Sequence, residues 1–109
     1  MLLGWERIRY LEGNWRRIAE EVKAEAMRHG EVLKVVVYGS VIKGKATGAS
    51  DLDVAVIYRG SLTPKERRRR SLEIYLALPE PDSDLVDLKV LGEDEAEAFL
   101  SLIGQYVEV

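Results

Sequence analysis

Two aspartates, one residue apart, stand at the head of a strongly apolar segment, residues 54–58. Residues two positions apart on a β-strand point to the same face, so Asp51 and Asp53 are expected to stand side by side. Carboxylates held this close repel each other unless a positive charge lies between them. A hard divalent cation such as Mg²⁺ is the usual solution, and Mg²⁺ commonly binds together with substrate phosphates. The pair therefore indicates metal-assisted phosphate chemistry.

A glycine–serine pair precedes these acids. Gly39 and Ser40 follow another apolar segment, residues 32–38, and ten residues separate them from Asp51. We expect the pair to lie at a turn from a strand into a short helix over residues 41–45. The missing Cβ of Gly39 would let a phosphate approach, and free backbone N–H groups and the helix dipole would attract it. The phosphate-binding turn at Gly39–Ser40 and the two carboxylates together predict a site for a nucleoside triphosphate and a metal.

This combination of residues resembles the defining motif of the DNA polymerase β-like nucleotidyltransferase superfamily. The matching residues are Gly39-Ser40, a spacer of ten residues that ends in Ser50, and Asp51-x-Asp53 before an apolar run. The short chain is most similar to the minimal nucleotidyltransferases (MNT), which are commonly encoded beside a helical HEPN-domain partner as a toxin–antitoxin pair. The resemblance covers nearly the whole chain.

The resemblance implies a third aspartate on a neighbouring strand, and two residues could supply it. Asp84 and Asp87 are separated by an odd number of positions, so a regular strand would place them on opposite faces. If Asp87 faces the site, the opposite face carries Val86, Leu88 and Val90, which suit a core. We therefore prefer Asp87 and keep Asp84 as the alternative.

The resemblance also implies a mechanism. Two Mg²⁺ ions would be held by the three acids Asp51, Asp53 and Asp87. The phosphates of the nucleotide, expected to be ATP, would be held by Gly39, Ser40 and Lys43. Asp87 would act as general base for an incoming hydroxyl, pyrophosphate would leave, and AMP would remain on the acceptor.

The acceptor is expected to be another protein. A chain of 109 residues has no room for the added domains with which larger superfamily members grip DNA, tRNA or an antibiotic. The resemblance implies a HEPN-type toxin as the partner, which makes this chain an antitoxin. The alternative is a non-catalytic binding module of the same fold that neutralises its partner by contact. RNA is a weaker candidate acceptor.

Composition limits the remaining possibilities. The sequence is 47% hydrophobic and 32% charged, which fits one compact domain over residues 1–109. The net charge of −3 argues against binding of nucleic acid by the whole surface, and the absence of cysteine excludes disulfides and zinc–thiolate sites. No apolar stretch approaches the roughly 20 residues of a membrane helix, so we expect a cytoplasmic protein. Scarce Asn and Gln beside abundant Arg, Glu and Lys favour a thermophilic source.

The periodicity predicts the elements that position these groups. An amphipathic helix is expected within residues 5–29, with a possible start at Asn14 because Gly13 and Asn14 interrupt the pattern. Strands are expected at 32–38, 51–58 and 84–91, with a short extended tail at 106–109. A last helix is expected at 93–103. The predicted fold is α/β (α+β): a short mixed sheet with helices on one face and the metal site on the other.

A further helix is expected to begin at Thr63, with Pro64 in its first turn and Glu66 completing a capping box. We expect it to reach about residue 78 and to bury Leu72, Tyr75 and Leu76. Its four consecutive arginines, residues 67–70, point in different directions and so cannot form one patch. We expect them to be solvated and paired with nearby acids; otherwise they could grip an acidic partner or RNA.

Overall fold

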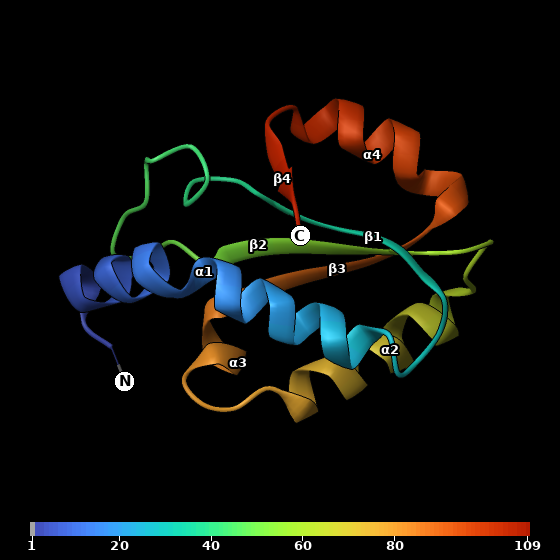
Figure 1. The fold of residues 1–109 in the computed structure, drawn as a ribbon, viewed down its shortest axis with the longest axis horizontal. Helices are drawn as coiled ribbons and strands as arrows, with labels where there is room; N and C mark the ends of the chain where they lie inside the picture. Colours follow the sequence, from blue (N-terminus) through green and yellow to red (C-terminus); the bar gives the residue numbers. More distant parts are fainter. Residues whose placement is uncertain (1) are drawn as a thin grey trace.

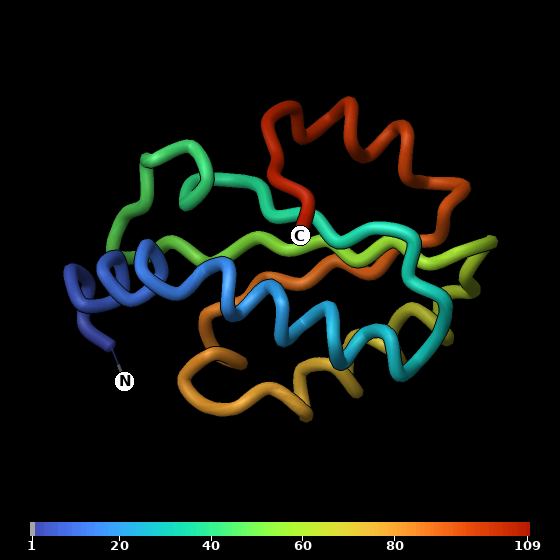
Figure 2. Tube along the Cα trace, viewed as in Figure 1, coloured from blue at the N-terminus to red at the C-terminus, as the bar shows by residue number. Residues whose placement is uncertain are grey.

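The computed structural model describes residues 2–109, and Figures 1 and 2 show the course of the chain. Four helices, one 3₁₀ turn and four strands follow one another in the described part of the chain. In order they are α1 (Gly4–Ala26), β1 (Val32–Tyr38), β2 (Leu52–Tyr58), α2 (Pro64–Ala77), α3 (Asp82–Leu85), β3 (Val86–Gly92), η1 (Glu93–Glu95), α4 (Ala96–Ile103) and β4 (Tyr106–Glu108).

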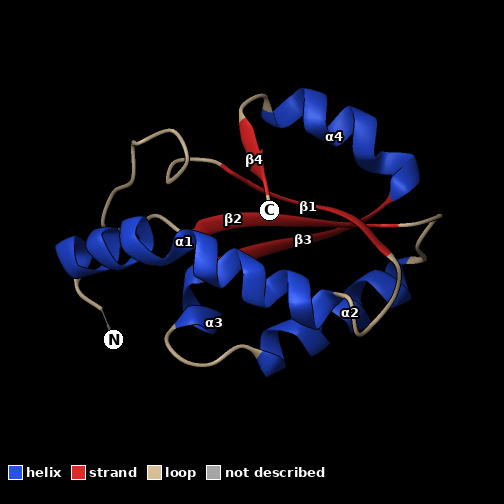
Figure 3. Ribbon diagram, viewed as in Figure 1, coloured by secondary structure: helices blue, strands red, loops and turns tan. Residues whose placement is uncertain are grey.

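The strands form one mixed sheet in the order β3-β2-β1-β4. β1 runs antiparallel to both β2 and β4, whereas β2 and β3 are parallel and are joined through α2. A parallel pair needs such a crossover, because a tight turn cannot return the chain to the same end of the sheet. The predicted α+β class with a short mixed sheet is confirmed (Figure 3).

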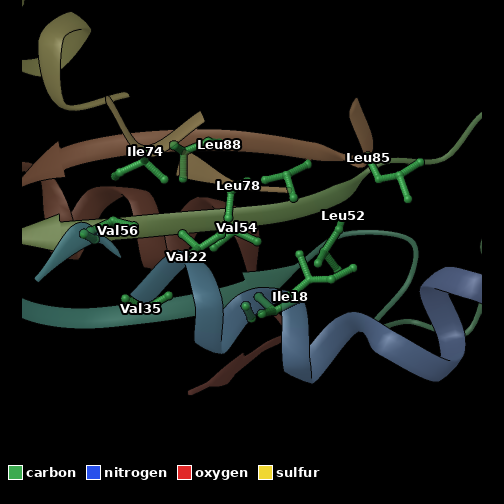
Figure 4. Close-up of a cluster of buried hydrophobic side chains, with 14 of the residues drawn as sticks. Ile18, Val22, Val35, Leu52, Val54, Val56, Ile74, Leu78, Leu85 and Leu88 are labelled. Atoms are coloured by element: carbon green, nitrogen blue, oxygen red, sulfur yellow. The ribbon is translucent and has the colours of Figure 1, made fainter. Parts of the chain in front are cut away.

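The main core lies between the sheet and helices α1 and α2 (Figure 4). Alternate residues of β2, from Leu52 to Tyr58, all enter it, as the alternation of the sequence predicted. The other fully buried members come from both helices and from β1; they include Leu11, Ile18, Val22, Val35, Val37 and Ile74. This layer fixes which face of β2 points to the helices, so Asp53 must lie on the opposite face.

That opposite face is covered in part by α4. The ring of Phe99 meets the ring of Tyr38 edge-on, with centroids 5.4 Å apart and an interplanar angle of 84°. Tyr38 pairs with Asp53 across β1 and β2, so α4 lies on the same side of the sheet as this aspartate. The expectation of helices on one face therefore describes α1 and α2, while α4 packs on the other (Figure 1).

Helix α1 is longer than the sequence indicated. It begins at Gly4, and Gly13 and Asn14 lie inside it. Asn14 is not a cap, because its side-chain amide donates to the carbonyl of Tyr10 one turn earlier, at 2.8 Å. The buried stripe that includes Leu11 continues through this region, so packing against the sheet outweighs the weak helix propensity of glycine.

Helix α2 begins as predicted. The Thr63 hydroxyl accepts a hydrogen bond from the Glu66 N–H at 3.1 Å, and the Glu66 carboxylate accepts one from the Thr63 N–H at 3.0 Å. Its buried side is nevertheless not the predicted one. Ile74 is fully buried, whereas Leu72 is 58% and Leu76 is 77% exposed. Relative to the predicted orientation, the helix is rotated about its axis, because Ile74 fills the core and Tyr75 reaches the outer edge of the sheet.

The hydroxyl of Tyr75 completes the edge strand β3. It donates to the Val86 carbonyl at 3.0 Å and accepts from the Leu88 N–H at 2.8 Å. The backbone groups of residues two positions apart on a strand point to the same side, so the Val86 carbonyl and the Leu88 N–H both point away from β2. Helix α2 thereby fixes the strand that carries Asp87.

The segment before β3 differs from the predicted strand. Residues 82–85 form the short helix α3, and β3 begins at Val86. Asp82 is almost completely buried and accepts hydrogen bonds from the Tyr10 hydroxyl at 2.6 Å and the Arg17 guanidinium at 3.0 Å. These bonds tie the turn to α1 and satisfy a charge that would otherwise be unfavourable to bury.

No helix in residues 2–109 has the length and apolar character that a membrane span requires.

The rotation of α2 can be tested by truncating one side chain on each of its faces. Ile74→Ala is expected to lower the free energy of unfolding by about 2–5 kcal/mol, because it leaves a cavity in the core. Leu76→Ala is expected to change it by less than about 0.5 kcal/mol, because the side chain is exposed. Urea unfolding of both variants checks this, and equal losses would contradict the observed face.

Candidate active site

The site is built on two neighbouring parallel strands. Asp53 is the second residue of β2 and Asp87 the second of β3, and the two strands pair with these aspartates in register. Both side chains project from the face opposite the main core, because Leu52, Val54, Val86 and other flanking residues occupy the core face. The fold thus brings together two carboxylates that are 34 residues apart in the sequence.

Crowding and burial change the acidity of Asp53. Burial, followed by the negative charges of Asp87 and Asp51, raises the pKa of Asp53 from 3.8 to about 6, although Lys89 opposes the shift. Lys89 lies two residues after Asp87 on β3, with its Nζ 3.4 Å from Asp87 Oδ1. Burial and neighbouring negative charges both disfavour the ionised carboxylate, and a bound cation would relieve both.

Gly39 is required by its contact with Asp53. Its backbone has a φ of +84°, and a Cβ placed there would lie 2.0 Å from Asp53 Oδ2. A side chain would therefore collide with the carboxylate as well as strain the backbone. The group that comes close to Gly39 in this structure is the Asp53 carboxylate, and the predicted approach of a phosphate stays a prediction.

The segment after Gly39 is a hydrogen-bonded turn and not the predicted helix. The N–H of Lys43 donates to the Gly39 carbonyl at 3.1 Å, and that of Lys45 donates to the Ser40 carbonyl at 2.9 Å. Two turns do not build a helix dipole, so that part of the phosphate argument was wrong. The N–H groups of residues 40–42 have no hydrogen-bond partner within residues 2–109, which leaves them free to donate to an anion.

Two serines join the ends of this loop. The Ser40 hydroxyl donates to Ser50 Oγ at 3.0 Å, and Ser50 Oγ also accepts from the Thr47 N–H at 2.8 Å. The turn at Gly39 and the start of β2 are thereby held together. Lys43, in the same loop, is exposed.

Arg7 is the residue that sequence reasoning missed. It projects from the first turns of α1, donates from Nε to the Ser50 carbonyl at 2.7 Å, and forms an ion pair through Nη2 with Asp51 Oδ1. Only 19% of its side chain is exposed, against 48% for Asp51. Nothing local in the sequence marks Arg7, because its partners lie more than 40 residues away. Figure 2 shows the loop lying beside the start of α1.

The acids present suit a hard cation, but Asp51 is engaged elsewhere. Asp53 and Asp87 face each other with oxygen donors, the ligand type that Mg²⁺ prefers. Among residues 2–109, no three acidic or histidine side chains gather closely enough to hold one metal ion. A three-carboxylate site would therefore need the Asp51 carboxylate to share or leave Arg7.

The structure separates the two candidates for the third acid. Asp87 lies on β3 opposite Asp53, while Asp84 lies in α3, before the strand begins. Asp84 instead lines a separate cavity with Arg7 and Pro81. The sequence argument assumed that both residues lie on one strand, and that assumption is wrong because β3 begins only at Val86. The role of Asp87 as the third acid stays a prediction.

The contact at Gly39 can be tested against a second glycine of the same loop. Gly44 also has a positive φ, +70°, but a Cβ there would meet nothing within 4 Å. Gly44→Ala is expected to lower the unfolding free energy by about 1–2 kcal/mol through backbone strain alone. Gly39→Ala is expected to lose more, because it also displaces Asp53. Urea unfolding measures both, and equal losses would show that the contact with Asp53 is unimportant.

The raised pKa of Asp53 gives a pH dependence in the metal-free protein. The folded state holds a proton on Asp53 up to about pH 6, whereas the unfolded state loses it near the ordinary value of about 4. Stability therefore falls as pH rises through this window. Asp53→Asn is expected to stabilise the protein at pH 7, and the gain should fade towards pH 4. Thermal unfolding with a chelator present measures it, and a gain that does not depend on pH would contradict the assignment.

Comparisons with known proteins agree with this geometry. Residues 20–101 match the model of the family described as polymerase beta, nucleotidyltransferase. A search of curated proteins gave no match. The fold is similar to the crystal structure of a candidate nucleotidyltransferase from Sulfolobus solfataricus, with a TM-score of 0.69 and 18% identity over 94% of this chain and 85% of that one. With its matched span and its paired aspartates, this chain belongs to the polymerase beta nucleotidyltransferase family.

Proposed function

We propose that this chain transfers a nucleotidyl group, AMP from ATP, to a hydroxyl group of a partner protein, and that Mg²⁺ is required. The observation that carries the proposal is the pairing of Asp53 with Asp87 beside the Gly39–Ser40 turn. The turn offers free N–H groups for phosphates, and the acids offer oxygen ligands on the same face of the sheet. Family membership supports nucleotidyl transfer in general.

Each residue has a defined part in this proposal. Mg²⁺, held by Asp51, Asp53 and Asp87, would stabilise the charge that develops on the attacking and leaving oxygens of an in-line displacement. The backbone after Gly39 and the Ser40 hydroxyl would hold the phosphates beyond the reacting one. Lys43, on the exposed part of the loop, would add positive charge near them.

The bond changes follow from this arrangement. The acceptor oxygen forms a bond to the α-phosphorus as the bond from that phosphorus to its bridging oxygen breaks, and pyrophosphate departs. The proton of the acceptor hydroxyl passes to the Asp87 carboxylate and then to solvent. AMP remains attached to the acceptor oxygen through a phosphodiester bond.

The proposed acceptor is a HEPN-domain protein whose toxicity the transfer would silence. This part rests on the resemblance of the motif to minimal nucleotidyltransferases.

The proposal is tested with ATP labelled at the α-phosphate, Mg²⁺, the purified chain and the HEPN-domain protein encoded beside it. Label is expected on the partner with the wild-type chain and is expected to be lost with Asp51→Asn, Asp53→Asn or Asp87→Asn. Asp84→Asn is the matched control, since it makes the same change outside the site, and it should retain transfer.

Two results would overturn the proposal. Full transfer by Asp53→Asn would remove the site assignment. A stable complex that forms equally well with Asp53→Asn, together with no label from the wild type, would indicate a non-catalytic module that neutralises its partner by contact.

A further inference from the structure

The outer face of α2 carries apolar side chains that the fold leaves uncovered. Leu72 and Leu76 are 58% and 77% exposed, and they lie one helical turn apart. Arg68 precedes Leu72 by one more turn and is exposed as well. These three residues form a single row along the helix, which we call the α2 row.

The charge on this side of the molecule is not balanced by the chain itself. Arg67 is paired with Glu95 at 2.5 Å, and Arg70 lies 3.8 Å from Glu66 and over the ring of Tyr58. Arg68, in contrast, forms no ion pair within residues 2–109. The sequence expectation that the arginines pair with nearby acids is confirmed for Arg67 and Arg70 and is wrong for Arg68 and Arg69, which form no ion pair within residues 2–109. The guanidinium of Arg68 therefore lies beside the exposed leucines of the row without an acidic partner from residues 2–109.

A groove joins the α2 row to the active-site strand. It has a volume of about 410 Å³ and lies between α2 and the outer edge of β3. Leu72 and Tyr75 line it from the helix, Leu88 lines it from the strand, and Arg68 and Lys89 carry the positive charge along it. Lys89 lines the groove, and its Nζ lies 3.4 Å from Asp87 Oδ1, so the groove borders a residue that contacts the candidate catalytic carboxylate.

We propose that the α2 row and this groove dock a segment of a partner protein that combines carboxylates with apolar side chains. Carboxylates would pair with Arg68 and Lys89, and apolar side chains would bury Leu72 and Leu76. This inference rests on the proposed function in one respect: the docked protein is the acceptor.

The surface fits a protein better than RNA. Phosphates would satisfy Arg68 and Lys89, but they would leave the apolar wall and both leucines facing water. A protein segment satisfies both parts of the surface together. Charge depletion with a few buried apolar and arginine anchors is the usual composition of a protein interface centre.

The test compares variants of the α2 row with a matched variant elsewhere. The double variant Arg68→Glu/Leu72→Asp alters the row, and Arg68→Glu alone serves as the milder form. Leu102→Asp repeats the leucine-to-aspartate part of this change on α4, where Leu102 is 84% exposed. Urea unfolding verifies that each variant folds, and calorimetry with Mg²⁺ and ATP verifies that nucleotide binding is unchanged.

Binding of the HEPN-domain protein is then measured by calorimetry, and label transfer is measured in parallel. The double variant is expected to bind about 100-fold more weakly and to lose transfer, whereas Leu102→Asp should behave as the wild type. Asp53→Asn should bind normally and transfer nothing, which separates failure of docking from failure of chemistry.

Three outcomes would overturn the docking inference. If the double variant binds the partner within about twofold of the wild type, the interface lies elsewhere. This conclusion holds whether or not the label is transferred. Loss of binding to an oligouridylate, with partner binding intact, would assign the row to RNA. Absence of partner binding by the wild type would remove both this inference and the proposed acceptor.

Discussion

The parallel pairing of β2 with β3 is the constraint on which the site depends. It sets Asp53 opposite Asp87 and so forces two negative charges together in a partly buried place, which is unfavourable in the absence of a cation. The apolar layer under the same strands supplies the compensating energy, since alternate residues of β2 from Leu52 to Tyr58 are buried against α1 and α2. The two faces of β2 therefore have opposed effects: the face towards α1 and α2 stabilises the fold, and the face with Asp53 brings negative charges together.

Much of this was predictable because it depends on short-range patterns. Two-residue alternation gave the faces of β2, and the β-branched run 32–38 gave the bounds of β1. The capping box at Thr63 gave the start of α2. The Gly39–Ser40 pair and the two aspartates at fixed spacing indicated the family. In each case the signal and its structural effect lie within a few residues of each other.

The parts that sequence reasoning missed depend on distant contacts. The orientation of α2 depends on which of its apolar sides packs on the sheet. The side with Ile74 is buried and the side with Leu72 and Leu76 is exposed. In this orientation the hydroxyl of Tyr75 reaches a backbone partner at the sheet edge. Helix α1 runs through Gly13 because packing on either side holds it. Arg7 could not be related to Asp51 without knowing that the helix start lies against the loop. Such outcomes are set by competition among tertiary contacts, which local propensity does not describe.

The hydroxyl of Tyr75 has a consequence for how this protein meets other chains. β3 is an edge strand with a strongly apolar sequence, and such an edge is a natural template on which a foreign strand can add. Tyr75 already occupies the outward carbonyl of Val86 and the outward N–H of Leu88, so the template is interrupted beside Asp87. The hydroxyl of Tyr75 thus disfavours sheet-to-sheet aggregation at this place. A neighbouring chain must recognise the edge beside Asp87 through side chains rather than through backbone hydrogen bonds.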